Sequence, residues 1–195
     1  MDETNLAPEG HELRFEADLR GHRFRFVTTW GLFHPKGLDA GTALLIDRIE
    51  VPPAAVCLDL GCGWGPLGCA LAKLAPEGRV DLVDKDFVAV GYARRNAEAN
   101  GCANARVYLS NGFHHIGGEE RFDLIASNLP AKAGSELLDH WMAEASRRLR
   151  PGGVLWVVTV AGLKAYVKRL FGERFGNYRK VAQGRSHVVA AARRQ

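Results

Sequence analysis

Short apolar runs alternate with helical patterns along the chain from residue 56 onward. The runs are rich in aliphatic side chains, and they are Val56–Leu60, Val80–Asp84, Ala105–Leu109, Phe122–Asn128 and Val154–Thr159. Strands that are apolar along their whole length are buried on both faces of a sheet. Their alternation with helices predicts an α/β fold, in which helices cover both faces of a parallel sheet.

Helices are predicted before and between these runs. The spacing of Ala40–Ile49 is helical, and Pro52-Pro53 ends that segment. Leu67–Leu74 and Phe87–Asn100 follow the first and second runs. Gly101 suits the left-handed backbone conformation that ends many helices.

A further helix is predicted over Ser135–Leu149. We expect Ser135 to be its N-cap and Pro151 to stop it. Its large apolar residues share one face, which predicts core contacts for Leu138, Trp141, Met142, Ala145 and Leu149.

Both ends of the chain depart from the alternation. Apolar and polar residues alternate on either side of Arg20-Gly21, which predicts an N-terminal β-hairpin. Near the other end, a helix over Lys164–Phe171 is followed by Arg179–Val181 and Ser186–Ala192, two strands with no helix between them. These two strands predict a terminal antiparallel hairpin on the parallel sheet.

The length of 195 residues suits one compact domain. We expect residues 1–50 to form a hairpin-and-helix extension packed on a core of residues 51–195. The four cysteines are scattered without a C-x-x-C pair, so we expect ordinary small residues and no metal at Cys57, Cys62, Cys69 and Cys102.

Two features argue against export and membrane insertion. The acidic start, Met1-Asp2-Glu3, lacks the character of a secretory signal. The longest apolar run, Val154–Leu163, has about half of the ~20 residues that a membrane span needs. We therefore expect a cytoplasmic protein.

Charge is distributed unevenly along the chain. Residues 147–195 hold twelve Lys and Arg against one acidic residue, Glu173, a net charge of +11. The first 146 residues carry a net charge of −7. A basic C-terminal quarter favours a polyanionic partner such as RNA, and a merely solvated basic surface is the alternative.

A glycine-rich turn follows the first predicted strand, over Asp59–Gly68. Glycines at such a turn let the backbone approach a ligand closely, at the sheet edge where open α/β folds bind ligands. Asp84 ends the next strand and is placed to accept hydrogen bonds from ribose hydroxyls. Gly63-x-Gly65-x-x-Gly68 also satisfies the dinucleotide pattern, so a nicotinamide oxidoreductase stays an alternative. However, the Asp59 carboxylate suits an ammonium or sulfonium group better than a diphosphate.

These residues resemble a known family. Asp59–Gly65 resembles motif I of the class I S-adenosylmethionine-dependent methyltransferases, which have a Rossmann-like fold. Gly31-Leu32-Phe33 and the following Leu38–Leu45 resemble the pre-motif segment of the small-domain methyltransferases. That family includes the bacterial ribosomal RNA guanine-N2 methyltransferases, and the resemblance covers about residues 11–192.

The resemblance implies a set of cofactor-binding residues. The turn residues Asp59, Gly61, Cys62, Gly63 and Gly65 are expected to hold the methionine end of S-adenosylmethionine. Asp84 is expected to bind the ribose hydroxyls, Lys85 is counted among the cofactor-binding residues, and Asn111 stands where the family usually has an Asp facing adenine. An Asn side-chain oxygen still accepts a hydrogen bond. Closure from the N-terminal side is expected from Phe33, Asp39 and Thr42.

The segment Asn128-Leu129-Pro130-Ala131 resembles the family's Asn-Pro-Pro-aromatic catalytic motif. By resemblance, the Asn128 side-chain oxygen and the Leu129 carbonyl accept the N–H groups of an exocyclic amine and aim its lone pair at the methyl group. Asn128 is also counted among the cofactor-binding residues, and Pro130 keeps Leu129 extended.

Two residues of this segment bear on substrate binding. Ala131 replaces the aromatic residue that stacks on the substrate base, and Lys132 adds a cation for a phosphate. Replacements for the missing aromatic are sought among Trp64, Phe113, His114 and His115.

The leading hypothesis is methylation of a guanine amino group in ribosomal RNA. A second hypothesis is methylation of a protein glutamine or a small amine, which related enzymes with this motif perform. A third is a cofactor-binding module that has lost catalysis, because both departures from the motif lie in the catalytic loop.

Overall fold

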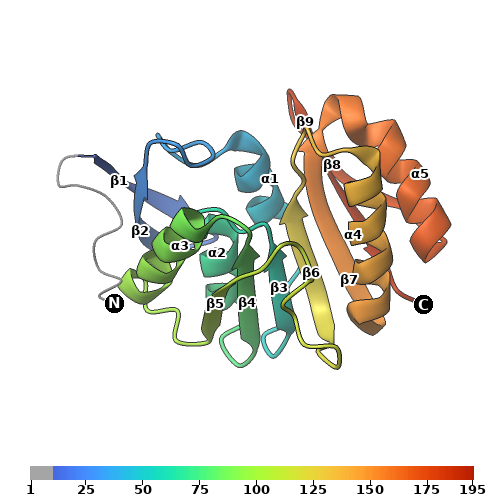
Figure 1. Ribbon diagram of the computed structural model, residues 1–195, viewed down its shortest axis with the longest axis horizontal. Coiled ribbons are helices and arrows are strands. Elements are labelled where there is room, and N and C mark those ends of the chain that lie inside the picture. Colours follow the sequence, from blue (N-terminus) through green and yellow to red (C-terminus); the bar gives the residue numbers. More distant parts are fainter. Residues whose placement is uncertain (1–10) are drawn as a thin grey trace.

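The computed structural model describes residues 11–195, and its centre is a seven-stranded sheet (Figure 1). The strand order is β5-β4-β3-β6-β7-β9-β8. Their bounds are β3 (Val56–Leu60), β4 (Arg79–Asp84), β5 (Ala105–Leu109), β6 (Phe122–Asn128), β7 (Leu149–Val160), β8 (Arg179–Gln183) and β9 (His187–Arg193). The strands from β5 to β7 pair in parallel, whereas β9 runs antiparallel to both β7 and β8. The predicted α/β sheet with its terminal hairpin is confirmed.

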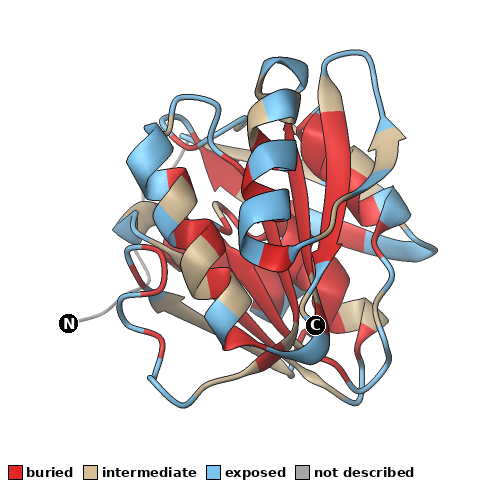
Figure 2. Ribbon diagram, turned by 90° about the vertical axis from the view of Figure 1, so that its right-hand side faces the viewer, coloured by how far each residue is buried: buried red, intermediate tan, exposed pale blue. Residues whose placement is uncertain are grey.

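Helices cover both faces of this sheet (Figure 1). One face carries α1 (Ala40–Arg48), α2 (Pro66–Leu74) and α3 (Phe87–Ala99). The other carries α4 (Ser135–Arg148) and α5 (Lys164–Phe175), which a 3-10 turn over Ala161–Leu163 precedes. In Figure 2 the strands are buried and the helices are exposed on their outer sides. The sheet is thus the middle layer of three.

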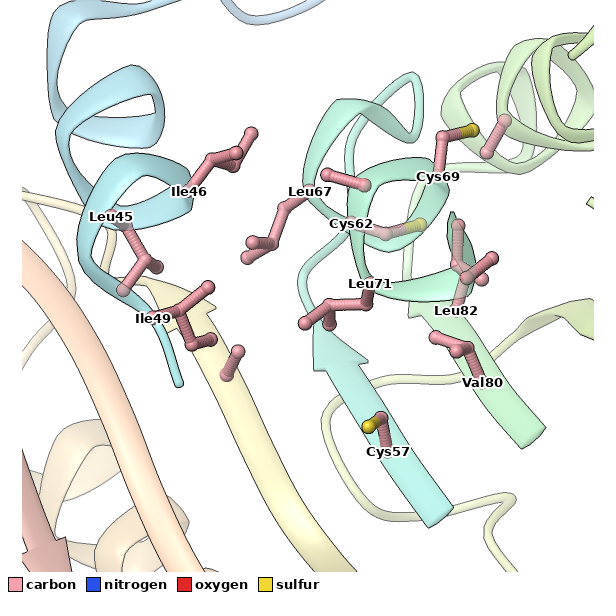
Figure 3. Close-up of a cluster of buried hydrophobic side chains, with 14 of the residues drawn as sticks. Leu45, Ile46, Ile49, Cys57, Cys62, Leu67, Cys69, Leu71, Val80 and Leu82 are labelled. Atoms are coloured by element: carbon pink, nitrogen blue, oxygen red, sulfur yellow. The ribbon is translucent and has the colours of Figure 1, made fainter. Parts of the chain in front are cut away.

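Each face of the sheet has its own hydrophobic cluster. The first joins α1, α2 and the strands beneath, where Leu45, Leu67, Leu71 and Leu82 lie among the buried side chains of Figure 3. The second lies under α4 and α5, and it includes the five residues predicted to share a core face. All four cysteines are buried free thiols.

Several predicted boundaries were wrong, and three of them change how an element begins or ends. Gly134 is the N-cap of α4 and no side chain caps it, so Ser135 is the first helical residue. β7 begins at Leu149, because the chain pairs with Phe122 of β6 directly after the helix and takes Pro151 into the strand. Finally, α5 continues to Phe175, where Gly176 ends it at a φ of 70°.

The N-terminal hairpin consists of β1 (Glu12–Leu19) and β2 (His22–Thr29), and it forms a separate two-stranded sheet. Its turn residues Arg20 and Gly21 both have positive φ, the conformation of tight two-residue hairpin turns. The hairpin packs against α3 through β2. The division into residues 1–50 and 51–195 stays a prediction.

The acidic start, Met1-Asp2-Glu3, lies outside the described residues. Within residues 11–195, no helix has the length and apolar character needed to cross a membrane. The same residues contain no cluster of three or more metal-ligating side chains.

Candidate active site

A cavity of about 540 Å³ opens at the carboxyl ends of β3, β4, β6 and β7. The connections from β3 and β6 leave in opposite directions along the sheet, which is the place where open α/β sheets form a ligand crevice. Most of the predicted site residues lie on its wall: Phe33, Asp39, Thr42, Asp59, Gly61, Cys62, Gly63, Asp84, Lys85, Asn111, Asn128, Leu129, Pro130 and Ala131.

Two predicted residues do not lie on this wall. Gly65 is buried behind it, where an added Cβ would stand 3.1 Å from the Cα atom of Ala93. Gly65 therefore allows α2 to begin close against α3, which is a packing role. Lys132 lies in the exposed loop after Pro130, outside the cavity.

The glycine-rich turn adopts backbone conformations that favour glycine. Gly61, Gly63 and Gly65 have φ values of 76°, 56° and 93°. The N–H groups of Gly61 and Cys62 both donate to the Val83 carbonyl of β4, at 2.9 Å. This pairing holds the turn against the neighbouring strand and leaves its other side open to the cavity.

Asp84 is held by backbone groups on both of its oxygens. Oδ2 accepts from the Gly63 N–H at 2.9 Å, and Oδ1 accepts from the Asp86 N–H at 3.0 Å. A carboxylate fixed in this way has acceptor capacity left on both oxygens, which suits a pair of hydroxyl donors.

Asp59 is a buried carboxyl group with an unsatisfied oxygen. Its side chain is 1% exposed, and Oδ2 has no hydrogen-bond partner among residues 11–195. The pKa of Asp59 is raised to about 8, chiefly by burial and also by the charge of Asp84, while the Gly68 N–H acts in the opposite direction. A cation in the cavity would compensate this cost and stabilise the ionised form.

Asn128 has a fixed side-chain orientation. Its Nδ2 donates to Asp39 Oδ2 and to Thr42 Oγ1, each at 2.9 Å. Because a carboxylate only accepts, the amide nitrogen must face Asp39, and the Asn128 oxygen is directed away from it. Asp39 is itself fixed as the N-cap of α1, where its Oδ2 accepts the Thr42 N–H at 2.9 Å.

The residues after Asn128 extend the same edge of the cavity. Leu129 is buried and its N–H donates to the Val158 carbonyl at 2.9 Å. Within residues 11–195 no donor reaches the Leu129 carbonyl. The site therefore presents two acceptors on successive residues, a side-chain oxygen and a backbone carbonyl.

The proposed aromatic replacements for Ala131 do not take its place. Phe113, His114 and His115 are not on the cavity wall. Trp64 is on it but is buried against Phe15 and Phe26, with its Nε1 donating to the Phe33 carbonyl at 3.0 Å. Phe33 is an aromatic that is exposed at the cavity, with 67% of its surface accessible.

Several wall residues were missed by sequence reasoning. Trp141 was predicted as core only, and it is both core and cavity wall because α4 crosses the cavity edge. Val160 at the end of β7, His187 at the start of β9 and the loop residues carry no sequence signal that separates them from packing residues. The missed residues are His34, Pro66, Leu67, Ser110, Gly112, Leu137, Trp141, Val160 and His187.

Comparison with known proteins gives the family. The model of the methyltransferase small domain matches residues 23–191. The chain belongs to this family. The ribosomal RNA small subunit methyltransferase C of Pseudomonas aeruginosa is 30% identical to this chain over 200 residues, which cover 100% of this chain and 59% of that protein. The Klebsiella pneumoniae protein of the same name is 37% identical over 157 residues, which cover 78% and 44%.

A solved structure is similar to nearly the whole of this chain. The 16S rRNA N2 methyltransferase of T. thermophilus, in complex with AdoMet and guanosine, has a TM-score of 0.85 at 27% identity. The match covers 97% of this chain and 52% of that one. The fold and the family resemblance are thereby confirmed. The chain spans about half the length of these ribosomal RNA methyltransferases.

Proposed function

We propose that this chain is an S-adenosylmethionine-dependent N-methyltransferase that acts on an exocyclic amino group of a base, guanine N2, in ribosomal RNA. The observation that carries the proposal is the orientation of Asn128. Asp39 and Thr42 hold its amide nitrogen, so its oxygen is available as an acceptor beside the free Leu129 carbonyl. The relatives that are named as ribosomal RNA methyltransferases support the choice of substrate.

The cavity fits S-adenosylmethionine. The buried Asp59 carboxyl group on the cavity wall matches a positively charged ligand, the fixed Asp84 carboxylate matches ribose hydroxyls, and the open side of the Gly61–Gly63 turn admits backbone approach. Lys85 and Asn111 also line the cavity wall, and both follow Asp84 in the chain. We assign them to the adenosine end of the cofactor. The cofactor supplies an electrophilic methyl group on a sulfonium sulfur.

The two acceptors position the substrate amine. An exocyclic amine on a base is planar because its lone pair is delocalised into the ring. When the Asn128 oxygen and the Leu129 carbonyl accept its two N–H groups, the amine is held with its lone pair aimed out of the ring plane. Catalysis then rests on positioning and electrostatics, and no general base is required for the transfer.

An RNA substrate is supported by cations beside the cavity. Lys85 lies on its wall, and Lys132 follows the wall residue Ala131. Lys164 and Arg185 stand four and two residues along the chain from the wall residues Val160 and His187. None of the four forms an ion pair with a carboxylate among residues 11–195. Phe33 is the candidate to stack on the base in place of the missing aromatic. We place the protein in the cytoplasm, with its substrate.

The test is transfer of labelled methyl from S-adenosylmethionine into ribosomal subunits, RNA and protein from cells that lack this gene. Nuclease release of labelled N2-methylguanosine supports the proposal. Label in protein or in small amines supports the second hypothesis instead. No transfer together with intact cofactor binding supports a module that has lost catalysis.

A further inference from the structure

A second hollow, which we name the basic pocket, lies at the opposite edge of the sheet from the active site. It has a volume of about 310 Å³ and is lined by Gly118, Arg121, Arg147, Arg148 and Arg194. These residues come from the loop before β6, the end of α4 and the end of the chain after β9. The seven residues of β6 separate the two edges, about 23 Å at a rise of ~3.3 Å per residue.

The basic pocket has an uncompensated positive charge. Glu144 is the one carboxylate paired with its arginines in the described part of the chain, at 2.6 Å from Arg147 and 3.4 Å from Arg148. Arg121 and Arg194 bond only backbone carbonyls there. Four guanidinium groups thus face one carboxylate, and their mutual repulsion favours an anion between them.

The guanidinium groups are already held in place. Arg121 Nη1 donates to the Gly118 carbonyl at 2.8 Å, and Arg194 Nη1 donates to the Arg147 and Leu149 carbonyls. Arg148 donates to the Gly117 carbonyl at 2.7 Å and lies over the Phe113 ring. Since these side chains are ordered before any ligand arrives, binding costs less conformational entropy.

The alternative explanation of the basic pocket is that its arginines only cap the carbonyl groups at the end of α4. Capping explains the position of one nitrogen, Nη1 of Arg194. It does not explain why three more guanidinium groups line the same pocket. Each of the described bonds leaves further N–H donors free, and the planar guanidinium matches a pair of phosphate oxygens.

We propose that the basic pocket binds a phosphate group, and that this phosphate belongs to the backbone of the RNA substrate, outside the target nucleotide. The choice of RNA rests on the proposed function, whereas phosphate binding does not. A strand that reaches both the cavity and the basic pocket must span the height of the sheet.

The first arm of the test uses inorganic phosphate. The thermal midpoint is measured in phosphate and in chloride at equal ionic strength for the wild type, Arg121→Gln and Arg169→Gln. Arg169 is an exposed residue of α5 paired with Glu173, so its variant removes the same charge elsewhere. Phosphate is expected to raise the midpoint of the wild type and of Arg169→Gln only. An equal response of all three proteins overturns the proposal.

The second arm measures affinity for the ribosomal RNA substrate at several salt concentrations. Arg121→Gln is expected to bind about tenfold more weakly, with a salt slope smaller by about 1. The loss is expected to exceed that of Arg169→Gln, while affinity for S-adenosylmethionine stays equal in both. If Arg121→Gln does not fold, Arg121→Lys keeps the charge and loses the planar fork, and a partial loss is expected.

The two arms separate the possible failures. Phosphate binding that depends on Arg121, with no change in RNA affinity, overturns the RNA assignment and leaves a site for a free anion. If the wild type methylates no RNA, the proposed function fails. The phosphate arm still tests whether the basic pocket binds phosphate.

Discussion

At the scale of single residues, the site depends on the amide of Asn128 being held in one orientation. A free Asn side chain presents its oxygen or its nitrogen with similar ease. Asp39 and Thr42 remove that freedom by accepting both bonds from Nδ2. The orientation of the Asn128 amide is therefore set by two acceptors, Asp39 and Thr42, that lie outside the catalytic loop.

Replacing Asn128 with alanine removes the side-chain acceptor. We expect kcat to fall by about 10²- to 10³-fold, the usual effect of losing one preorganised polar group that acts in the transition state. The dissociation constant of S-adenosylmethionine is expected to change little. Single-turnover methyl transfer and calorimetry measure the two quantities, and unchanged turnover would remove this mechanism.

Asp39→Ala tests the orientation of Asn128. We expect kcat to fall by about tenfold or more, because the amide is free to turn, and the stability to fall by about 1 kcal/mol through loss of the α1 cap. Asp86→Ala is the matched control, because Asp86 caps α3 by accepting the Val88 and Ala89 N–H groups. An equal loss of turnover in both variants would assign Asp39 a purely structural role.

The raised pKa of Asp59 predicts a pH dependence. Its folded-state pKa of about 8 lies above the ordinary value, so its contribution to stability is fully present below about pH 4 and is lost as the pH rises through 8. A cationic ligand favours the ionised form, so at pH 7 cofactor binding is expected to release close to one proton from Asp59. Calorimetry in buffers of different ionisation enthalpy measures this release, which Asp59→Asn should abolish.

At the scale of elements, two side-chain amides, one in α3 and one at its C-cap, hydrogen-bond backbone groups of β2 that a third strand would otherwise bond. Asn96 Oδ1 accepts the Val27 N–H at 2.8 Å, and its Nδ2 donates to the Val27 and Trp64 carbonyls at 2.9 and 2.8 Å. One turn later, Asn100 makes the same pair of bonds with Arg25. These bonds attach β2 to α3 and to the glycine-rich turn.

Asn96→Ala leaves buried backbone groups without partners. We expect a loss of about 3 kcal/mol in the free energy of unfolding, because Asn96 is fully buried and serves three backbone groups. The matched variant Asn100→Ala affects more exposed bonds and is expected to cost about 1 kcal/mol. Urea unfolding followed by circular dichroism measures both, and equal losses would contradict the assignment.

At the scale of the whole molecule, positive charge is present at both edges of the sheet. Lys85 lies on the cavity wall, Lys132, Lys164 and Arg185 are within four residues of wall residues in sequence, and the basic pocket lies at the other edge. The net charge of +11 over residues 147–195 is thus spread over α5, the terminal strands and the end of α4.

This distribution predicts salt-dependent RNA binding. With about three phosphate contacts, the affinity should fall about 40-fold between about 50 and about 200 mM salt. Filter binding with a ribosomal RNA fragment measures the slope. Affinity that does not respond to salt would count against a nucleic-acid partner.

The sequence by itself determined the order of strands and helices, the glycine-rich turn and the residues at the ends of β3, β4 and β6. Local signals suffice for these features, because burial on two faces requires apolar strands and tight turns require glycine. The glycine-rich turn and the end of the next strand predicted Asp59 and Asp84 as candidates, whereas Asn128 was predicted from its resemblance to the family's catalytic motif.

Only the tertiary structure decided which side chains meet. Packing sets Gly65 behind the cavity wall, places Trp141 and His187 on that wall, and brings Asp39 to Asn128. Likewise, Arg121 and Arg194 share a pocket although 73 residues separate them in sequence. Such contacts depend on how distant segments pack, and no local pattern of residues encodes them.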